Sequence, residues 1–317
     1  MIFPYAVLAL ALSVHLFGGH PSLENKGIVH KGKTVSLVIP KNPLAAGSVK
    51  IESHTGRNSF TDWTDDDHLE SREAIDKIIQ IWKENSINDY LVFARESNHS
   101  SSPFSWEVVP YPKAGWWFWK QFKVLYNITF GSSSILKIEQ QQRAKTLHQE
   151  LSLLPDIEET APPDSEGNDV FCDPVIIARQ LIFEGNEINI LYSHAPIAFG
   201  EKKLHFLIVP KQHRQKFSDL TKSEYLEAMQ LSRKLVNFYQ RKGDSTVYLF
   251  HKTGIEAGQM IPHWIGHVVF AATKTQEFFS KLRVLKNMMF GSSPLSEEEF
   301  ARRVESLQKE LAEALKN

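Results

Sequence analysis

Hydrophobic and polar residues alternate along several short segments of the chain, most clearly in GQMIPHWIGHVVF, residues 258–270. Side chains of a β-strand alternate between its two faces, so positions 263, 265 and 267 would share one face that reads His, Ile, His. The same alternation predicts further strands in TVSLVI, DYLVFAR, FSWEVV, KLHFLIV and TVYLFHK.

A second rhythm, with apolar residues three and four apart, predicts two long helices. One carries Ile75, Ile78, Ile79 and Trp82, and the other carries Ser232, Leu235, Val236 and Tyr239 on its buried face. Thr221, followed three residues later by Glu224, has the spacing of a capping box at the start of the second helix. Strands joined by short connections, with helices on one side, predict an α+β fold on an antiparallel sheet.

The order of these elements repeats along the chain. FWKQFKVLYNITFGSS at 118–133 matches FFSKLRVLKNMMFGSS at 278–293, and shorter matches join FTDWT to FSDLT and PLAAG to PIAFG. Collinear matches of this kind predict two tandem copies of one domain. The predicted organisation is an apolar N-terminal segment at 1–22, a first domain at 23–153, an acidic, Pro-rich linker at 154–169 and a second domain at 170–317.

Composition and charge exclude some classes of protein. The 317 residues are 42% hydrophobic and 23% charged, as in globular proteins, and the net charge of −1 argues against a nucleic-acid partner. The single cysteine, Cys172, excludes an intramolecular disulfide and a Cys-rich zinc site.

The N-terminus contains an apolar run from Ala6 to Phe17, which is too short to span a bilayer as a helix. Its length suits the core of an export signal or a membrane anchor, although no Lys or Arg precedes it. A secreted or membrane-associated location is therefore favoured over a cytoplasmic one, with membrane association through this segment alone. A buried N-terminal segment is the alternative interpretation.

The second copy resembles the histidine-triad (HIT) superfamily. The residues that carry the resemblance are FLIVPKQH, FSDLT and KTGIEAGQMIPHWIGHVV, and the duplication is most similar to the galactose-1-phosphate uridylyltransferase branch. The resemblance implies two HIT-like domains related by a pseudo-twofold axis. It also implies a His-x-His-x-His motif whose middle histidine takes a nucleotidyl group from a phosphate ester or anhydride.

This chain departs from that motif. By resemblance His263 is the first histidine and His267 the third, whereas Ile265 stands at the nucleophile's position and has no lone pair to form a covalent intermediate. Met260 replaces a Ser or Thr, and Lys252 replaces an Asn. The first copy has Pro103, Ser105 and Glu107 at the three histidine positions. The cysteine-based metal ligands of some uridylyltransferases have no evident counterparts, so we expect neither a metal nor a cofactor.

Three functions remain open. The favoured one is a catalytically degenerate HIT-like protein that binds a nucleotide or phosphorylated sugar, or serves as an interaction scaffold. The alternative is an active nucleotidyl transferase or hydrolase whose nucleophile is His267 or His263. The third is a purely structural or secreted interaction protein whose groove is filled by side chains such as Met260 and Trp264. The candidate ligand-binding residues are Lys252, Gly258, Gln259, His263 and His267, whereas His213 is interpreted as a scaffold residue.

The segment GWWFWKQF, residues 115–122, concentrates three tryptophans, Trp116, Trp117 and Trp119. We favour a core that fills the degenerate first site. The alternative is a docking surface for a protein partner, because a large exposed apolar patch marks an interface.

Overall fold

A computed structural model describes residues 27–97, 103–113, 115–155, 167–197, 202–244, 246–271, 286–287 and 291–316. The predicted N-terminal segment at 1–22, most of the predicted linker and most of the 278–293 repeat lie outside these residues. No helix in the described ranges is long and apolar enough to cross a membrane.

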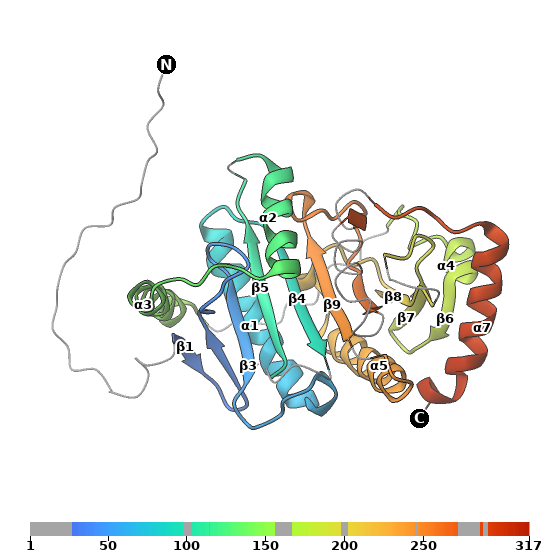
Figure 1. Ribbon diagram of the computed structural model, residues 1–317, viewed down its shortest axis with the longest axis horizontal. Helices are drawn as coiled ribbons and strands as arrows, with labels where there is room; N and C mark the ends of the chain where they lie inside the picture. Colours follow the sequence, from blue (N-terminus) through green and yellow to red (C-terminus); the bar gives the residue numbers. More distant parts are fainter. Residues whose placement is uncertain are drawn as a thin grey trace, which may run out of the picture.

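The described strands form one ten-stranded antiparallel sheet, in the order β1-β2-β3-β5-β4-β9-β10-β8-β7-β6. The helices lie against this sheet, so the predicted α+β class is confirmed (Figure 1). The strands are β1 Ile28–Lys31, β2 Val35–Val38, β3 Val49–Ser53, β4 Asp89–Ser97, β5 Ser105–Tyr111, β6 Leu181–Glu184, β7 Ile188–Tyr192, β8 His205–Pro210, β9 Thr246–Thr253 and β10 Gly266–Ala271.

The two halves of the sheet have the same internal strand order. The order β1-β2-β3-β5-β4 in the first half corresponds to β6-β7-β8-β10-β9 in the second, and the halves meet where β4 pairs with β9. Phe93 lies opposite Phe250 at this seam, Arg95 opposite Tyr248 and Lys252 opposite Leu91, so Arg95 and Lys252 occupy matching positions. This is the arrangement that a tandem duplication predicts; the duplication and its domain boundaries stay an interpretation.

The helices are α1 Asp65–Glu84, α2 Trp117–Phe130, α3 Lys137–Leu153, α4 Pro174–Gln180, α5 Lys222–Arg241 and α7 Glu297–Lys316, with the short 3-10 helices η1 Phe60–Asp62, η2 Phe217–Asp219 and η3 Ile255–Ala257. Capping boxes start both long central helices, Thr64 with Asp67 before α1 and Thr221 with Glu224 before α5. The buried Asp67 and Glu224 carboxylates also pair with Arg57 and Arg214. The helix-period prediction is confirmed, because Ile75 and Ile78 of α1 and Leu235 and Val236 of α5 are buried.

Helices α1, α3, α5 and α7 supply the larger core, on one face of the sheet. The opposite face carries α2 over the first half and α4 over the second, with two smaller apolar clusters beneath them (Figure 1). Residues 248, 250 and 252 of β9 and 267 of β10 point to this second face, because side chains alternate along each strand. The candidate site therefore lies on the face with the lighter helical cover.

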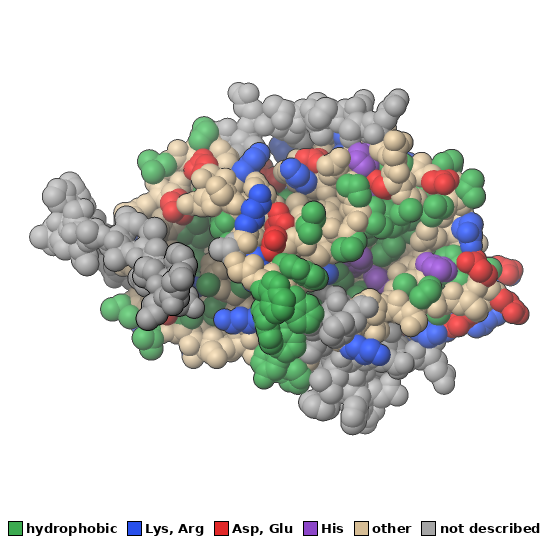
Figure 2. All heavy atoms as spheres, turned by 90° about the horizontal axis from the view of Figure 1, so that it is seen from above, with side chains coloured by type: hydrophobic (Ala, Val, Ile, Leu, Met, Phe, Trp, Pro, Cys, Tyr) green, Lys and Arg blue, Asp and Glu red, His purple; other side chains and the backbone are tan. Residues whose placement is uncertain are grey.

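The favoured prediction for the tryptophan segment was wrong. Trp116, Trp117 and Trp119 are 70%, 50% and 56% exposed, and Tyr126 and Phe130 extend the exposed aromatic surface along α2. Figure 2 shows hydrophobic side chains gathered in a patch on this face of the molecule. Only Gln121, Val124 and Leu125 of α2 are buried, so the helix turns a narrow side to the sheet and its aromatic side to solvent.

Candidate functional site

A pocket of about 230 Å³ lies on the second face of the sheet, over β8, β9 and β10. Its lining contains no Asp or Glu among the described residues. The lining residues are Ile197, His205, Phe250, Lys252, Gly258, Gln259, Met260, Ile261, His263, Ile265, His267 and Asn287. The structure thus brings all five predicted ligand-binding residues, together with Ile265, to one hollow.

Strand register explains this convergence. His267 of β10 lies opposite Phe250 of β9, and their rings stack at 4.5 Å with an interplanar angle of 13°. Gly266 lies opposite His251, so the same register places Ile265, just before β10, opposite Lys252. Side chains of opposed residues point to the same face of an antiparallel pair. Lys252 therefore stands beside Ile265 on this face of the sheet.

Hydrogen bonds fix the protonation of His205, which is buried, and of His267, which is half-buried. The Ile197 N–H donates to His205 Nδ1 at 3.2 Å, so the proton of neutral His205 is on Nε2, which lies 3.0 Å from His267 Nδ1. Burial lowers the pKa of His205 to about 3, and burial together with the His205 and Lys252 charges lowers the pKa of His267 well below its usual value. His267 therefore accepts at Nδ1 and keeps its own proton on Nε2, where it can donate to an anion.

Lys252 brings a positive charge into this apolar pocket. No hydrogen bond or ion pair joins its ammonium group to any residue in the described ranges, and burial lowers its pKa to about 8. Gly258 permits this placement. Its φ of 85° favours glycine, and a Cβ there would stand 3.3 Å from Lys252 Nζ. Lys252 is half-buried, and a partly desolvated ammonium without a partner is unfavourable, so an anionic ligand would stabilise it.

Gln259 holds the loop between β9 and β10 in place. Its side-chain oxygen accepts from the Gly254 N–H at 2.7 Å, and its amide donates to the carbonyls of Gln215 and His263. Met260 is 88% exposed at the rim, and Trp264 is fully buried in the larger core. The pocket therefore stays open, because neither of these large side chains fills it.

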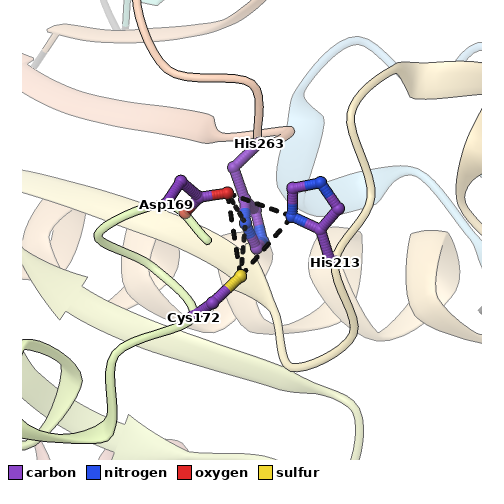
Figure 3. A group of neighbouring side chains, drawn as sticks. All are labelled: Asp169, Cys172, His213 and His263. Atoms are coloured by element: carbon purple, nitrogen blue, oxygen red, sulfur yellow. Dashed lines mark hydrogen bonds and ion pairs between the residues drawn. The ribbon is translucent and has the colours of Figure 1, made fainter. Parts of the chain in front are cut away.

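A second group of polar side chains adjoins the pocket at His263 (Figure 3). Asp169 Oδ2 lies 3.0 Å from His213 Nδ1 and 3.1 Å from His263 Nδ1. Cys172 Sγ lies 3.4 Å from His213 Nδ1, 3.9 Å from His263 Nδ1 and 3.7 Å from Asp169 Oδ2. Three separate segments of the chain thus point a carboxylate, a thiol and two imidazoles at one spot.

This donor set fits a divalent metal such as zinc. Usual Zn–S, Zn–N and Zn–O bond lengths in a tetrahedron give ligand–ligand separations of roughly 3.3–3.6 Å, close to those observed here. His263 Nε2 lies 3.3 Å from the Pro210 carbonyl and donates to it, which leaves the Nδ1 lone pair for a metal. Gly167 packs so closely that a Cβ there would lie 2.2 Å from His213 Nδ1.

We expected no metal site, whereas these four residues are placed so that they could hold a metal ion. Burial and the Asp169 charge raise the pKa of Cys172, and burial lowers the pKa of His263. The four ligand atoms lie within 4.8 Å of one another. His213, interpreted from the sequence as a scaffold residue, belongs to this cluster. The sequence signal for this cluster is Asp169-x-x-Cys172 followed by two histidines. It was missed because Asp169 lies in the predicted linker and because only one of the four residues is a cysteine.

Residues 177–273 match the model of the HIT domain family. The match confirms the resemblance that the motifs of the second half predicted. No curated protein matches the chain.

Several solved structures are similar at low identity. A GALT-like protein from Arabidopsis thaliana is 12% identical, with 76% of this chain and 75% of that chain covered and a TM-score of 0.47. An Arabidopsis thaliana ADP-glucose phosphorylase with bound ADP-glucose is 12% identical, covering 86% and 81%, with a TM-score of 0.48. A DUF4931 family protein from Bacillus cereus is 10% identical, covering 92% and 100%, with a TM-score of 0.48. These values are too low to transfer a ligand or an activity to this chain.

Proposed function

We propose that the pocket over β9 and β10 binds a nucleotide or a phosphorylated sugar, without histidine-dependent nucleotidyl transfer. The observation that supports this most directly is the unpaired Lys252 ammonium in a pocket whose described lining has no carboxylate. The Nε2–H of His267 adds a donor for a phosphate oxygen, and Phe250, Ile261 and Ile265 supply apolar walls. A phosphate group would contact the Lys252 ammonium and the His267 N–H, and a base or sugar would pack against the apolar walls.

The positions of the histidines argue against their use as nucleophiles. His267 Nδ1 accepts from His205, and the other nitrogen of His267 carries the proton. His263 directs one ring nitrogen at Asp169 and the other at the Pro210 carbonyl. The Nδ1 lone pair of His267 accepts from His205, and the Nδ1 lone pair of His263 faces the Asp169 cluster, so neither is available to attack phosphorus, and Ile265 offers none. The alternative of a nucleophilic His263 or His267 therefore requires both side chains to rearrange.

Isothermal titration tests the binding proposal with UMP, ADP-glucose, UDP-glucose, glucose 1-phosphate and inorganic phosphate. We expect at least one phosphate ester to bind, and we expect Lys252→Met to weaken that binding at least tenfold, about 1.4 kcal/mol. Lys252→Arg is the matched control, because it keeps the charge. Absence of binding by every ligand, or equal affinity of the Met variant, would overturn the proposal. Mapping of a covalent nucleotidyl group to His263 or His267 would favour the alternative.

A structural metal in the Asp169, Cys172, His213 and His263 cluster is part of this proposal. Four protein ligands are typical of closed, structural zinc sites, which leave no open position for a reacting group. When bound, the ion would supply the charge that lets a thiolate and a carboxylate stay buried together. These residues would tie the segment after the predicted linker to the pocket wall at His263.

Docking of a protein partner on the Trp116, Trp117 and Trp119 surface is a second candidate role. Its support is the exposure of these side chains on α2, since exposed tryptophans are enriched in interfaces. Membrane association through residues 1–22 concerns residues outside the described ranges and remains an expectation.

A further inference from the structure

Position 265, where the resembling family has its nucleophilic histidine, holds an isoleucine in this chain. The primary amine of Lys252 lies next to it. Lys252 is the cross-strand neighbour of Ile265 in the register that pairs Gly266 with His251. Both side chains line the same pocket, as does His267 one step along β10. An amine is among the few side chains that form covalent intermediates with electrophilic substrates.

The surroundings of Lys252 differ from those of a cation held for structure. Its ammonium has no carboxylate, hydroxyl or carbonyl partner in the described part of the chain, and Phe250 and Ile265 provide hydrocarbon nearby. At the matching place in the first half stands Arg95, whose guanidinium lies 5.9 Å from the Tyr248 ring centroid. Arg cannot give up its proton in a protein, whereas a buried Lys can.

We propose that Lys252 acts as a nucleophile that accepts the nucleotidyl group of a nucleoside diphosphate sugar bound in this pocket. The inference rests on the proposed binding of such ligands and adds a reaction to it. Lys252 lies on β9, the strand next to position 265. We infer that it takes the role of nucleophile that the motif's middle histidine has in the resembling family.

The step balances without a further reactant. The neutral Nζ attacks the phosphorus that carries the nucleoside, an N–P bond forms, and the bond from that phosphorus to the bridging oxygen breaks. The bridging oxygen leaves with the electron pair as part of the sugar phosphate, which also takes the proton lost by the amine. Attack by water or by a phosphate on the same phosphorus later breaks the N–P bond and returns a proton to Nζ.

The pocket supplies what this step requires. The lowered pKa of Lys252, about 8, leaves roughly a tenth of the amine neutral at pH 7. The Nε2–H of His267 is available to the phosphoryl oxygens, on which negative charge is held during the attack. The apolar side chain of Ile265 lines the pocket beside Lys252 and reduces the solvation of the amine.

The test incubates the full chain with UDP-glucose and with ADP-glucose, each carrying radiolabel in the nucleotide. Part of each sample is quenched in alkali, where a phosphoramidate survives, and the labelled peptide is identified by mass spectrometry. A second part is treated with acid, which releases the label. Titration calorimetry on the same samples measures binding independently of the label.

We expect acid-labile label on Lys252 and its loss in Lys252→Arg, whose guanidinium keeps the charge but gives up no proton to become a nucleophile. Lys211→Arg, at an exposed lysine paired with Glu184, is the matched control and should label like the unchanged chain. Binding without label, or label on any other residue, would overturn this inference and leave the binding proposal standing. Absence of binding would overturn both.

Discussion

The two halves of the sheet place different side chains at the same backbone positions. Strand pairing puts Glu107 of β5 opposite Phe93 and His267 of β10 opposite Phe250, and Phe93 and Phe250 face each other at the seam. In the first half Glu107 accepts the Leu44 N–H at 2.7 Å, whereas in the second half the corresponding Ile197 N–H goes to His205. The Glu107 carboxylate accepts a hydrogen bond from within the protein. The His205–His267 pair instead leaves the Nε2–H of His267 as a donor at the pocket.

Packing follows the same division. Val124 of α2 lies in one apolar cluster with Leu44, Leu91 and Val109, so the first half fills its own groove. The second half keeps a cavity with an unpaired lysine. The same strand order therefore gives a packed surface in the first half, where polar groups are satisfied internally. In the second half it gives a pocket, where the His267 donor and the Lys252 charge have no partner among the described residues.

Metal removal should have the largest effect, and it should act through the second half alone. The position that corresponds to His213 in the first half is Gly56, and the one that corresponds to His263 is Pro103. We expect about one zinc per chain by elemental analysis and a fall in Tm of roughly 10 °C on chelation, as for loss of a ligand present far above its Kd. Cys172→Ser should lower the metal content, and chelation should then shift Tm little. An unchanged Tm with no metal in the purified chain would contradict this prediction.

Substitution at Glu107 should lower stability without affecting ligand binding. Glu107→Leu removes the acceptor of the buried Leu44 N–H, at a cost of about 1–3 kcal/mol in the free energy of unfolding. Burial raises the pKa of Glu107, so Glu107→Gln, which keeps an acceptor without a charge, should be close to neutral. Urea denaturation measures the difference. Equal stability of the Leu and Gln variants would show that this hydrogen bond contributes little.

A histidine at position 265 should lower the free energy of unfolding and give little hydrolytic activity. Ile265→His places an imidazole where hydrocarbon now stands, and an imidazole without partners costs about 1–3 kcal/mol. We expect a folded protein with at most trace hydrolysis of a nucleoside phosphoramidate, and more when Met260→Ser supplies a hydroxyl for the leaving group. A Lys252→Arg background excludes a contribution from the lysine. Robust turnover by Ile265→His alone would refute the need for the hydroxyl.

Buried neutral histidines should make the protein less stable in acid. Burial lowers the pKa of His68 in the first half and of His205 and His251 in the second to about 3, below the usual 6.5. The unfolded chain binds protons below pH 6.5 and the folded chain does not, so stability falls from pH 6.5 towards pH 3, by about 1.4 kcal/mol per pH unit for each histidine. Neither ring nitrogen of His68 has a hydrogen-bond partner among the described residues. His68→Leu should therefore reduce the slope by one histidine's share in urea denaturation between pH 5 and 6.5, and an unchanged slope would contradict the assignment.

The exposed aromatic surface of α2 should matter least for stability. Joint replacement of Trp116, Trp117 and Trp119 by Gln should change the free energy of unfolding by less than about 0.5 kcal/mol per site, because exposed side chains contribute little to the core. Val124→Ala on the buried side of the same helix is the control and should cost more. A large loss in the Trp variant would mean that these side chains are covered in solution.

The sequence predicted the strands and the two central helices, because both follow from local periodicity. His263, Ile265 and His267 line one pocket, but β10 begins at Gly266, so only His267 of the three lies in the strand. The sequence placed Lys252 at the groove but could not show that no partner neutralises it, which depends on three-dimensional packing. The cluster of Asp169, Cys172, His213 and His263 was missed because its members come from three segments whose convergence has no periodic signature. The tryptophan segment was misjudged because apolar content alone does not say which side of α2 meets the sheet.

The strand order also governs how the sheet resists association with other chains. Its outer edges are β1 and β6, each of four residues and each with a register irregularity, and α3 and α7 lie against them. Short, bulged and covered edges are poor templates for strand addition. The longest strands, β4 with nine residues and β9 with eight, pair only with their neighbours inside the sheet. Opening the seam between them would uncover two long, regular edges, so aggregation of this protein should begin at its centre.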